Sequence, residues 1–346
     1  MTQSLQGHLS IIRDPRQAGK VVHRMSDIVM LSICAMVGGA EGWLDIEEFG
    51  STHEEWFRAQ GMFSNGIPVD DTIARVMSML SPKAFQTAFI AWMKDVTALT
   101  HGEVIAVDGK TLRRSHDRKA RKAPLHMVSA FACSNGVVLG QERSEAKSNE
   151  ITAIPALLKL LALKGCIVTI DAMGCQKAIA KQIRQGKGDY VLAVKDNQRS
   201  LHEAIVDWFD SAQAHGLKYA PHEYYEQTDK GHGRIEVRRY WVSEDLSGLP
   251  APERWAGLRS IGMAENEIHQ GDKRTIERRY FITTLAANAQ QFAHAVRNHW
   301  GIENRLHWVL DMSFREDECR IRRGDGAEIL GVVRHIALNL LRQDKT

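Results

Sequence analysis

The stretch at residues 104–115, VIAVDGKTLRRS, joins an apolar run to a single acid and then to a group of cations. The Val- and Ile-rich run predicts a buried β-strand that ends on Asp108. In open α/β sheets, ligands gather at the carboxyl ends of strands, where loops present side chains. Because an Asp-Gly pair is also common in turns, Asp108 by itself indicates either a turn or a ligand site at a sheet edge.

Strand and helix patterns alternate after this stretch. Two strand-like runs flank Asn135-Gly136, a strong signal for a β-hairpin, and a later apolar run, CIVTI, meets a second acid, Asp171. The order predicts an α/β fold with a mixed sheet covered by helices. The expected elements are a strand at 103–109, a hairpin at 125–145, a helix at about 151–163, a strand at 166–170, a helix at 176–184 and a strand at 190–194.

The regions on either side have different patterns. Residues 1–98 read as a small helical domain, in which Asp70 and Asp71 are expected to cap one helix and Ser81-Pro82 to open another. Strand patterns fill residues 213–286, and this segment is too long for a plain connection, so we expect a β-rich insertion. Further helices are expected at 201–212, at about 288–310 and at 328–341.

The composition limits the class of protein. Its 346 residues, 44% of them hydrophobic, can bury a sizeable core. An apolar leader and a run of the ~20 apolar residues that a membrane span needs are both missing from the sequence, so a cytoplasmic protein is expected. Five Cys residues without a CxxC pair fit a reducing compartment and argue against disulfides or a thiolate zinc site.

Basic residues gather in clusters, although the net charge is only +3. One such cluster is usually a solvated face, but four of them favour a polyanion as the partner. The clusters lie at residues 110–122, 230–239, 273–279 and 315–323.

A stripe of polar residues is expected on the helix at about 288–310. His299, Glu303, His307 and Asp311 recur every four residues and so share one face. His299, Glu303 and His307 are one candidate set of zinc ligands, although the spacing is not the His-Glu-x-x-His pattern of metalloproteases. Alternatively Asp108, Asp171 and Glu303 form an all-carboxylate site. Such a site needs a cation to offset the repulsion between the acids, and its oxygen ligands suit Mg²⁺ or Mn²⁺ and phosphoryl transfer.

Five motifs carry a resemblance to a known family: VIAVDGKTLRRS, VTIDAMGCQKAIA, YVLAVKDNQ, GHGRIEVRRY and the long C-terminal run that starts at VRNHWGIENRLHW. In this order they resemble the H-repeat-associated, ISAs-type insertion-sequence DDE transposases. The likeness covers nearly the whole chain, because DDTIARVMSML and the residues after it resemble the helical region that precedes the catalytic domain in that family.

The resemblance implies a helical N-terminal domain at residues 1–98 and a ribonuclease H-like catalytic domain at 99–346, with the β-rich insertion at about 213–286. It implies that Asp108, Asp171 and Glu303 are catalytic and bind metal, with Mg²⁺ or Mn²⁺ as cofactor, expected as two ions. The implied activity is cleavage of double-stranded DNA at the terminal inverted repeats of an element. The freed 3′ ends are then joined to target DNA by transesterification, and a homodimer on DNA is expected.

The chain departs from related cut-and-paste transposases around the catalytic Glu. Where those carry Tyr, Arg and Lys, this chain has Val296, His299 and Leu310, so the phosphate contacts cannot be carried over directly. The residues expected to bind DNA are Lys110, Arg113, Arg114, Lys195, Arg234, Arg297, His299 and Arg305. Two alternatives remain at this point: an inactive or recruited DNA-binding relic of such an element, and a zinc hydrolase.

Overall fold

The computed structural model describes residues 4–116, 123–144, 150–218, 220–231 and 233–344, which form two compact units. The first unit consists of Met1–Ala98, Gly109–Asn149 and Glu303–Thr346, and the second of Leu99–Asp108 and Glu150–Ile302. Strand β1 (Val104–Leu112) runs through both. Part of the predicted basic cluster at 110–122 lies outside the described residues.

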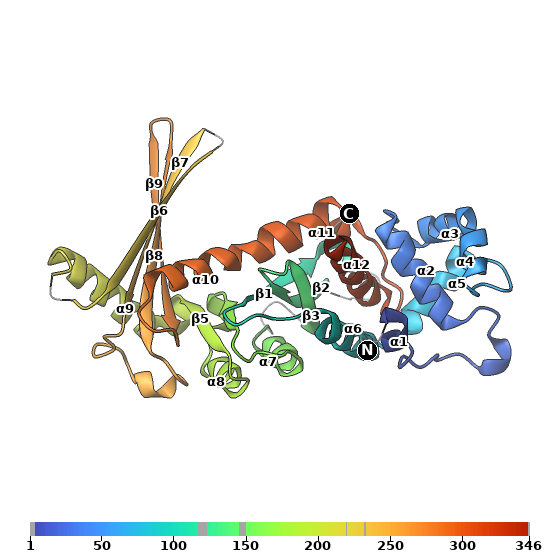
Figure 1. Ribbon diagram of the computed structural model, residues 1–346, viewed down its shortest axis with the longest axis horizontal. Helices are drawn as coiled ribbons and strands as arrows, with labels where there is room; N and C mark the ends of the chain where they lie inside the picture. Colours follow the sequence, from blue (N-terminus) through green and yellow to red (C-terminus); the bar gives the residue numbers. More distant parts are fainter. Residues whose placement is uncertain (1–3, 117–122, 145–149, 219, 232, 345–346) are drawn as a thin grey trace. The chain divides into compact units, whose positions relative to one another are not determined.

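Helices make up the N-terminal part of the first unit (Figure 1). Ser81 caps α6 as predicted, since its Oγ accepts a hydrogen bond from the Ala84 amide at 3.3 Å. The predicted caps Asp70 and Asp71 are wrong, because Val69 takes the cap position and both acids lie in the first turn of α5. The helices are α1 (Leu5–Leu9), α2 (Met25–Val37), α3 (Trp43–Thr52), α4 (Glu54–Ala59), α5 (Asp70–Met79) and α6 (Pro82–Val96).

A hairpin and a long helix complete the first unit. Strands β2 (Leu125–Ala132) and β3 (Val137–Ser144) pair antiparallel around Asn135-Gly136, which confirms the hairpin. Helix α12 (Gly326–Gln343) packs on β3, where buried Asn339 accepts from the Val138 amide at 2.9 Å and donates to its carbonyl at 2.8 Å. These two bonds satisfy the amide side chain in the core.

Parallel strands form the centre of the second unit. Strand β4 (Ile167–Ile170) pairs in parallel with β1 and with β5 (Asp189–Val194). Helices α7 (Glu150–Leu160), α8 (Lys177–Gln185) and α9 (Arg199–Ala214) follow the predicted order. The prediction that β1 ends on Asp108 is wrong, because β1 continues to Leu112.

The β-rich insertion is a four-stranded antiparallel sheet that we call the ribbon (Figure 1). It consists of β6 (Glu223–Gly231), β7 (Arg234–Ser243), β8 (Ser260–Gln270) and β9 (Lys273–Thr283). Helix α10 (Ala289–Ile302) packs against its base, where a side chain at Gly262 would collide with the Phe292 ring. The close approach fixes α10 to the sheet.

The strands follow the order β3-β2-β1-β4-β5-β9-β8-β7-β6. The β1, β4 and β5 pairs are parallel, and β5 pairs antiparallel with β9. The predicted α/β class with a mixed sheet is therefore confirmed. In the described parts of the chain, each helix is too short or too polar to cross a membrane.

Candidate functional site

Asp108 and Asp171 lie on neighbouring strands of the second unit. The last parallel pair between β1 and β4 joins Val107 to Ile170, and Asp108 and Asp171 are the next residues along the chain. Neighbouring strands are about 4.8 Å apart, so the backbones of the two acids lie close together where β4 ends. The pairing of the strands thus brings together two acids far apart in the sequence.

A tight turn after β4 orients the Asp171 carboxylate. Its Oδ1 accepts hydrogen bonds from the backbone amides of Met173 at 3.1 Å and Gly174 at 3.3 Å. A β-carbon at Gly174 would collide with Ile170, so the turn requires glycine. Within the described residues Oδ2 has no such donor, and it stays available to a ligand.

The environment of Asp171 disfavours its ionised form. Burial raises its pKa above the ordinary value, and Glu150 at the start of α7 adds to the rise. The backbone amides and Lys195 act in the opposite direction without reversing the shift. A carboxylate in such a place is stabilised by a bound cation.

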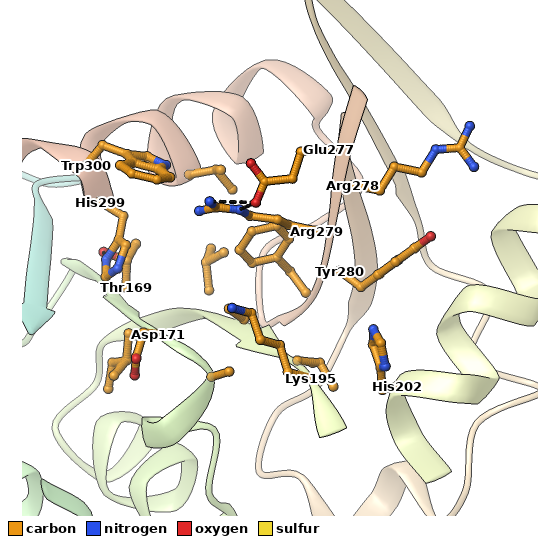
Figure 2. A pocket seen from close by; sticks show the side chains of 17 residues that line it. Thr169, Asp171, Lys195, His202, Glu277, Arg278, Arg279, Tyr280, His299 and Trp300 are labelled. Carbon is orange, nitrogen blue, oxygen red and sulfur yellow. Dashed lines mark hydrogen bonds and ion pairs between the residues drawn. The ribbon is translucent and has the colours of Figure 1, made fainter. Parts of the chain in front are cut away.

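A pocket of about 130 Å³ opens beside Asp171 (Figure 2). It lies wholly within the second unit. Lys195 follows β5 and points its ammonium into the pocket, while His299 and Trp300 come from α10 and Arg279 from β9. Acidic, basic and aromatic side chains therefore line one hollow.

Three contacts hold the side chains of the pocket wall. The His299 ring nitrogen Nδ1 lies 3.1 Å from the Thr169 hydroxyl. The Arg279 guanidinium lies 4.4 Å from the centre of the Trp300 ring and pairs with Glu277 at 2.8 Å. His299 was predicted from the sequence, whereas the grouping of Glu277, Arg279 and Trp300 was not. The alternation of residues 277, 279 and 281 on one face of a strand was the only available signal.

The third predicted acid, Glu303, belongs to the first unit and follows α10 directly in the chain. The predicted helix at 288–310 is interrupted by one wide π-turn at Glu303–His307 before α11 (Trp308–Met312). Such turns are frequent at functional sites. Within this turn, Nδ1 of buried His307 lies 3.6 Å from the Glu303 carboxylate.

Lys110 takes part in a buried ion-pair cluster of the first unit that we call the Glu316 network. Its ammonium pairs with Glu316 at 2.7 Å and with Asp311, and only 11% of its side chain is exposed. These two carboxylates pair with the Lys110 ammonium that was expected to contact DNA. Its DNA contact stays a prediction that the geometry does not support.

The other predicted DNA-binding residues differ in how far their charges are engaged. Arg305 donates to the Cys133 carbonyl at 2.6 Å and lies over the Phe131 ring. Arg113 pairs with Asp317 at 3.1 Å, although 81% of its side chain is exposed. Arg234 pairs with Glu236 at 2.5 Å. Arg114 and Arg297 are exposed.

Comparison with known proteins identifies the family to which this chain belongs. Residues 100–340 match the family described as Transposase DDE domain, and residues 6–93 match the family described as DDE_Tnp_1-associated. The chain belongs to the DDE transposase family, whose members depend on divalent metal ions and whose catalytic domain has the ribonuclease H-like fold. The resemblance seen in the sequence is confirmed.

Two relatives from Escherichia coli match almost the whole chain. The protein named "H repeat-associated putative transposase YhhI" of strain K12 is 46% identical over 99% of this chain and 91% of its own length. The protein named "Putative transposase YncI" of O157:H7 is 48% identical over 99% of this chain and 88% of its own length. A shorter relative from strain K12, "Inactive transposase YbfQ", is 59% identical over 22% of this chain and 90% of its own length.

Among solved structures, a piggyBac transposase synaptic complex with hairpin DNA resembles the chain with a TM-score of 0.44 and 11% identity. The match covers 99% of this chain and 70% of that one. At this TM-score the likeness carries no argument about function.

Proposed function

We propose that this protein cleaves phosphodiester bonds at the inverted-repeat ends of its own insertion sequence and joins the freed 3′ ends to target DNA. The observation that carries the proposal is the placement of Asp108 and Asp171 directly after the last paired residues of β1 and β4 in a chain of the DDE transposase family. Acids on neighbouring strands suit metal-dependent phosphoryl transfer.

Asp108, Asp171 and Glu303 are the residues that would hold the metal. Their oxygen ligands suit Mg²⁺ or Mn²⁺, and the raised pKa of Asp171 fits a carboxylate that awaits a cation. Two bound ions would activate the attacking oxygen and stabilise the leaving one. The backbone amides of Met173 and Gly174 hold the Asp171 carboxylate in one orientation for this task.

Lys195 and His299 would bind the DNA backbone next to these acids. Both line the pocket beside Asp171, and a Lys ammonium neutralises a phosphate as a point charge. Arg113, Arg114, Arg234 and Arg297 would supply further phosphate contacts along the double-stranded DNA. Cutting two ends together calls for a homodimer on DNA, which sedimentation of the complex with paired end fragments would measure.

The test uses the isosteric variants D108N, D171N and E303Q with duplexes cut from the DNA that flanks the gene. Each variant loses several kcal/mol of transition-state stabilisation, so Mg²⁺-dependent strand cleavage should fall by at least about 10³-fold. Binding to the same duplexes should persist, since the phosphate contacts are intact. The matched control is D196N, because Asp196 lies just after β5 with 96% of its side chain exposed.

Two results would contradict the proposal. Full cleavage by any of the three variants would remove that acid from the site. If the wild-type protein binds the ends but cleaves nothing with Mg²⁺ or Mn²⁺, it is a DNA-binding relic. One relative already carries the name "Inactive transposase".

A further inference from the structure

We propose that Arg279 of the ribbon is a phosphate-binding residue of the pocket beside Asp171, and that Glu277 occupies its guanidinium until DNA displaces the carboxylate. The inference rests on the proposed function and adds a contact from the insertion to the site. It also makes Glu277 a competitor of the phosphate for the Arg279 guanidinium.

The geometry of β9 directs Arg279 to the pocket. Glu277, Arg279 and Phe281 alternate along the strand, so their side chains share one face, and all three line the same pocket as Lys195 (Figure 2). Arg279 extends from β9 toward Trp300, above the ammonium of Lys195 in this view. A phosphate in the pocket would therefore meet a cation from β9 and another from the end of β5.

The guanidinium of Arg279 is held in place, but its contacts leave room for a phosphate. It lies 4.4 Å from the centre of the Trp300 ring, an arrangement that holds an Arg by its face and leaves N–H groups at its edge. Its contacts with Glu277, from Nε at 2.9 Å and from Nη2 at 2.8 Å, go to the same oxygen, Oε1. An Arg fork binds two oxygens of a phosphate in parallel, so a phosphate offers a better fit than this single oxygen.

Glu277 is a weak competitor because it is exposed. Of its side chain 60% is open to solvent, against 32% for Arg279. Exposed ion pairs contribute little and are screened by salt. Trp300 would keep Arg279 in place when the Glu277 carboxylate is displaced. Only the partner of the guanidinium would then change, from Glu277 to a phosphate.

The experiment measures the affinity for a short duplex of arbitrary sequence at a series of salt concentrations, with EDTA present so that metal binding plays no part. R279Q should weaken binding about tenfold and lower the salt slope by about 1, as expected for one lost phosphate contact. The matched control is R274Q on the same strand. Arg274 also pairs with a glutamate, Glu267, and lies outside the pocket lining.

The competitor is tested by E277Q. The variant should bind the duplex more tightly than the wild type, and the gain should vanish when R279Q is present, because the two residues act through one contact. An unchanged salt slope in R279Q, an equal loss in R274Q, or a gain from E277Q that survives in the double variant would each overturn the inference. All of these results are independent of cleavage, so the D171N test of the proposed function stands or fails separately.

Discussion

Lys110 of the Glu316 network in the first unit and Arg274 and Arg278 of the ribbon in the second all come from basic clusters of the sequence, yet these cations differ in burial. In the Glu316 network, Glu316 is 4% exposed and Arg334 2%, and Nε and Nη2 of Arg334 have no hydrogen-bond partner in the described part of the chain. In the ribbon, Arg274 is 59% and Arg278 39% exposed, and each pairs with one glutamate of β8.

The difference shows what a cluster of cations in a sequence does and does not indicate. Neighbouring strands and helices supply carboxylates to most of these arginines, so the cluster is no measure of a DNA-binding surface. Lys195 stands outside both groups and points into the pocket beside Asp171. Removal of a charge in the Glu316 network should therefore lower the stability of the fold. Removal of the Lys195 charge should weaken DNA binding, and removal of the Arg274 charge should change neither property.

The largest effect is expected in the Glu316 network. Burial alone would raise the pKa of Glu316, but Lys110, Arg334 and His335 hold it below the ordinary value. E316Q leaves Lys110 and Arg334 as buried charges, and it should lower the free energy of unfolding by about 3–5 kcal/mol. Urea denaturation measures this loss. E318Q serves as the control, because 54% of Glu318 is exposed, and its midpoint should stay that of the wild type.

The same network should make stability depend on pH. Burial lowers the pKa of His335 from 6.5 to about 4, and nearby His307, Lys110 and Arg334 act in the same direction against Glu316. The unfolded chain binds this proton near pH 6.5, so the stabilisation is present above that pH and is lost as the pH falls toward 4. Between about pH 7 and pH 5 the loss should be about 2 kcal/mol.

Urea denaturation at the two pH values checks this expectation. H335Q should flatten the difference, whatever its effect on stability at neutral pH, while H215Q at an exposed site should preserve it. An unchanged pH dependence in H335Q would assign the effect to another group.

A smaller effect is expected at Lys195. K195A removes one charge-assisted contact to a phosphate, so duplex binding should weaken about tenfold, or ~1.4 kcal/mol, with little change in the urea midpoint. K181A on α8 is the control for a general loss of positive charge, because Lys181 is exposed and lies outside the pocket lining. Equal weakening in both variants would mean that the pocket has no special part in binding.

The smallest effect is expected in the ribbon. R274Q removes one partner of buried Glu267, but the carboxylate keeps its contacts with Arg239 and His269, so the urea midpoint should stay close to that of the wild type. If R274Q lowered the urea midpoint as much as E316Q does, the two groups of ion pairs would contribute equally to stability, contrary to this prediction.

The sequence predicted much of this molecule. Its strand and helix periods located β1, the Asn135-Gly136 hairpin, β4, β5 and the insertion, because each element follows from local patterning and turn residues. Asp108 and Asp171 were found because acids that follow apolar runs are visible in the sequence. The family motifs, and no spacing rule, singled out Glu303 among the acids of its helix.

The sequence alone determined the order of elements and the identity of the acids, since both depend on neighbours within a few positions along the chain. Only the tertiary structure decided which charges meet. The continuation of β1 past Asp108, the π-turn at Glu303–His307 and the placing of Arg279 over Trp300 depend on strand pairing and helix packing between distant segments. Side-chain partners of this kind follow from packing in three dimensions, which local patterns do not encode.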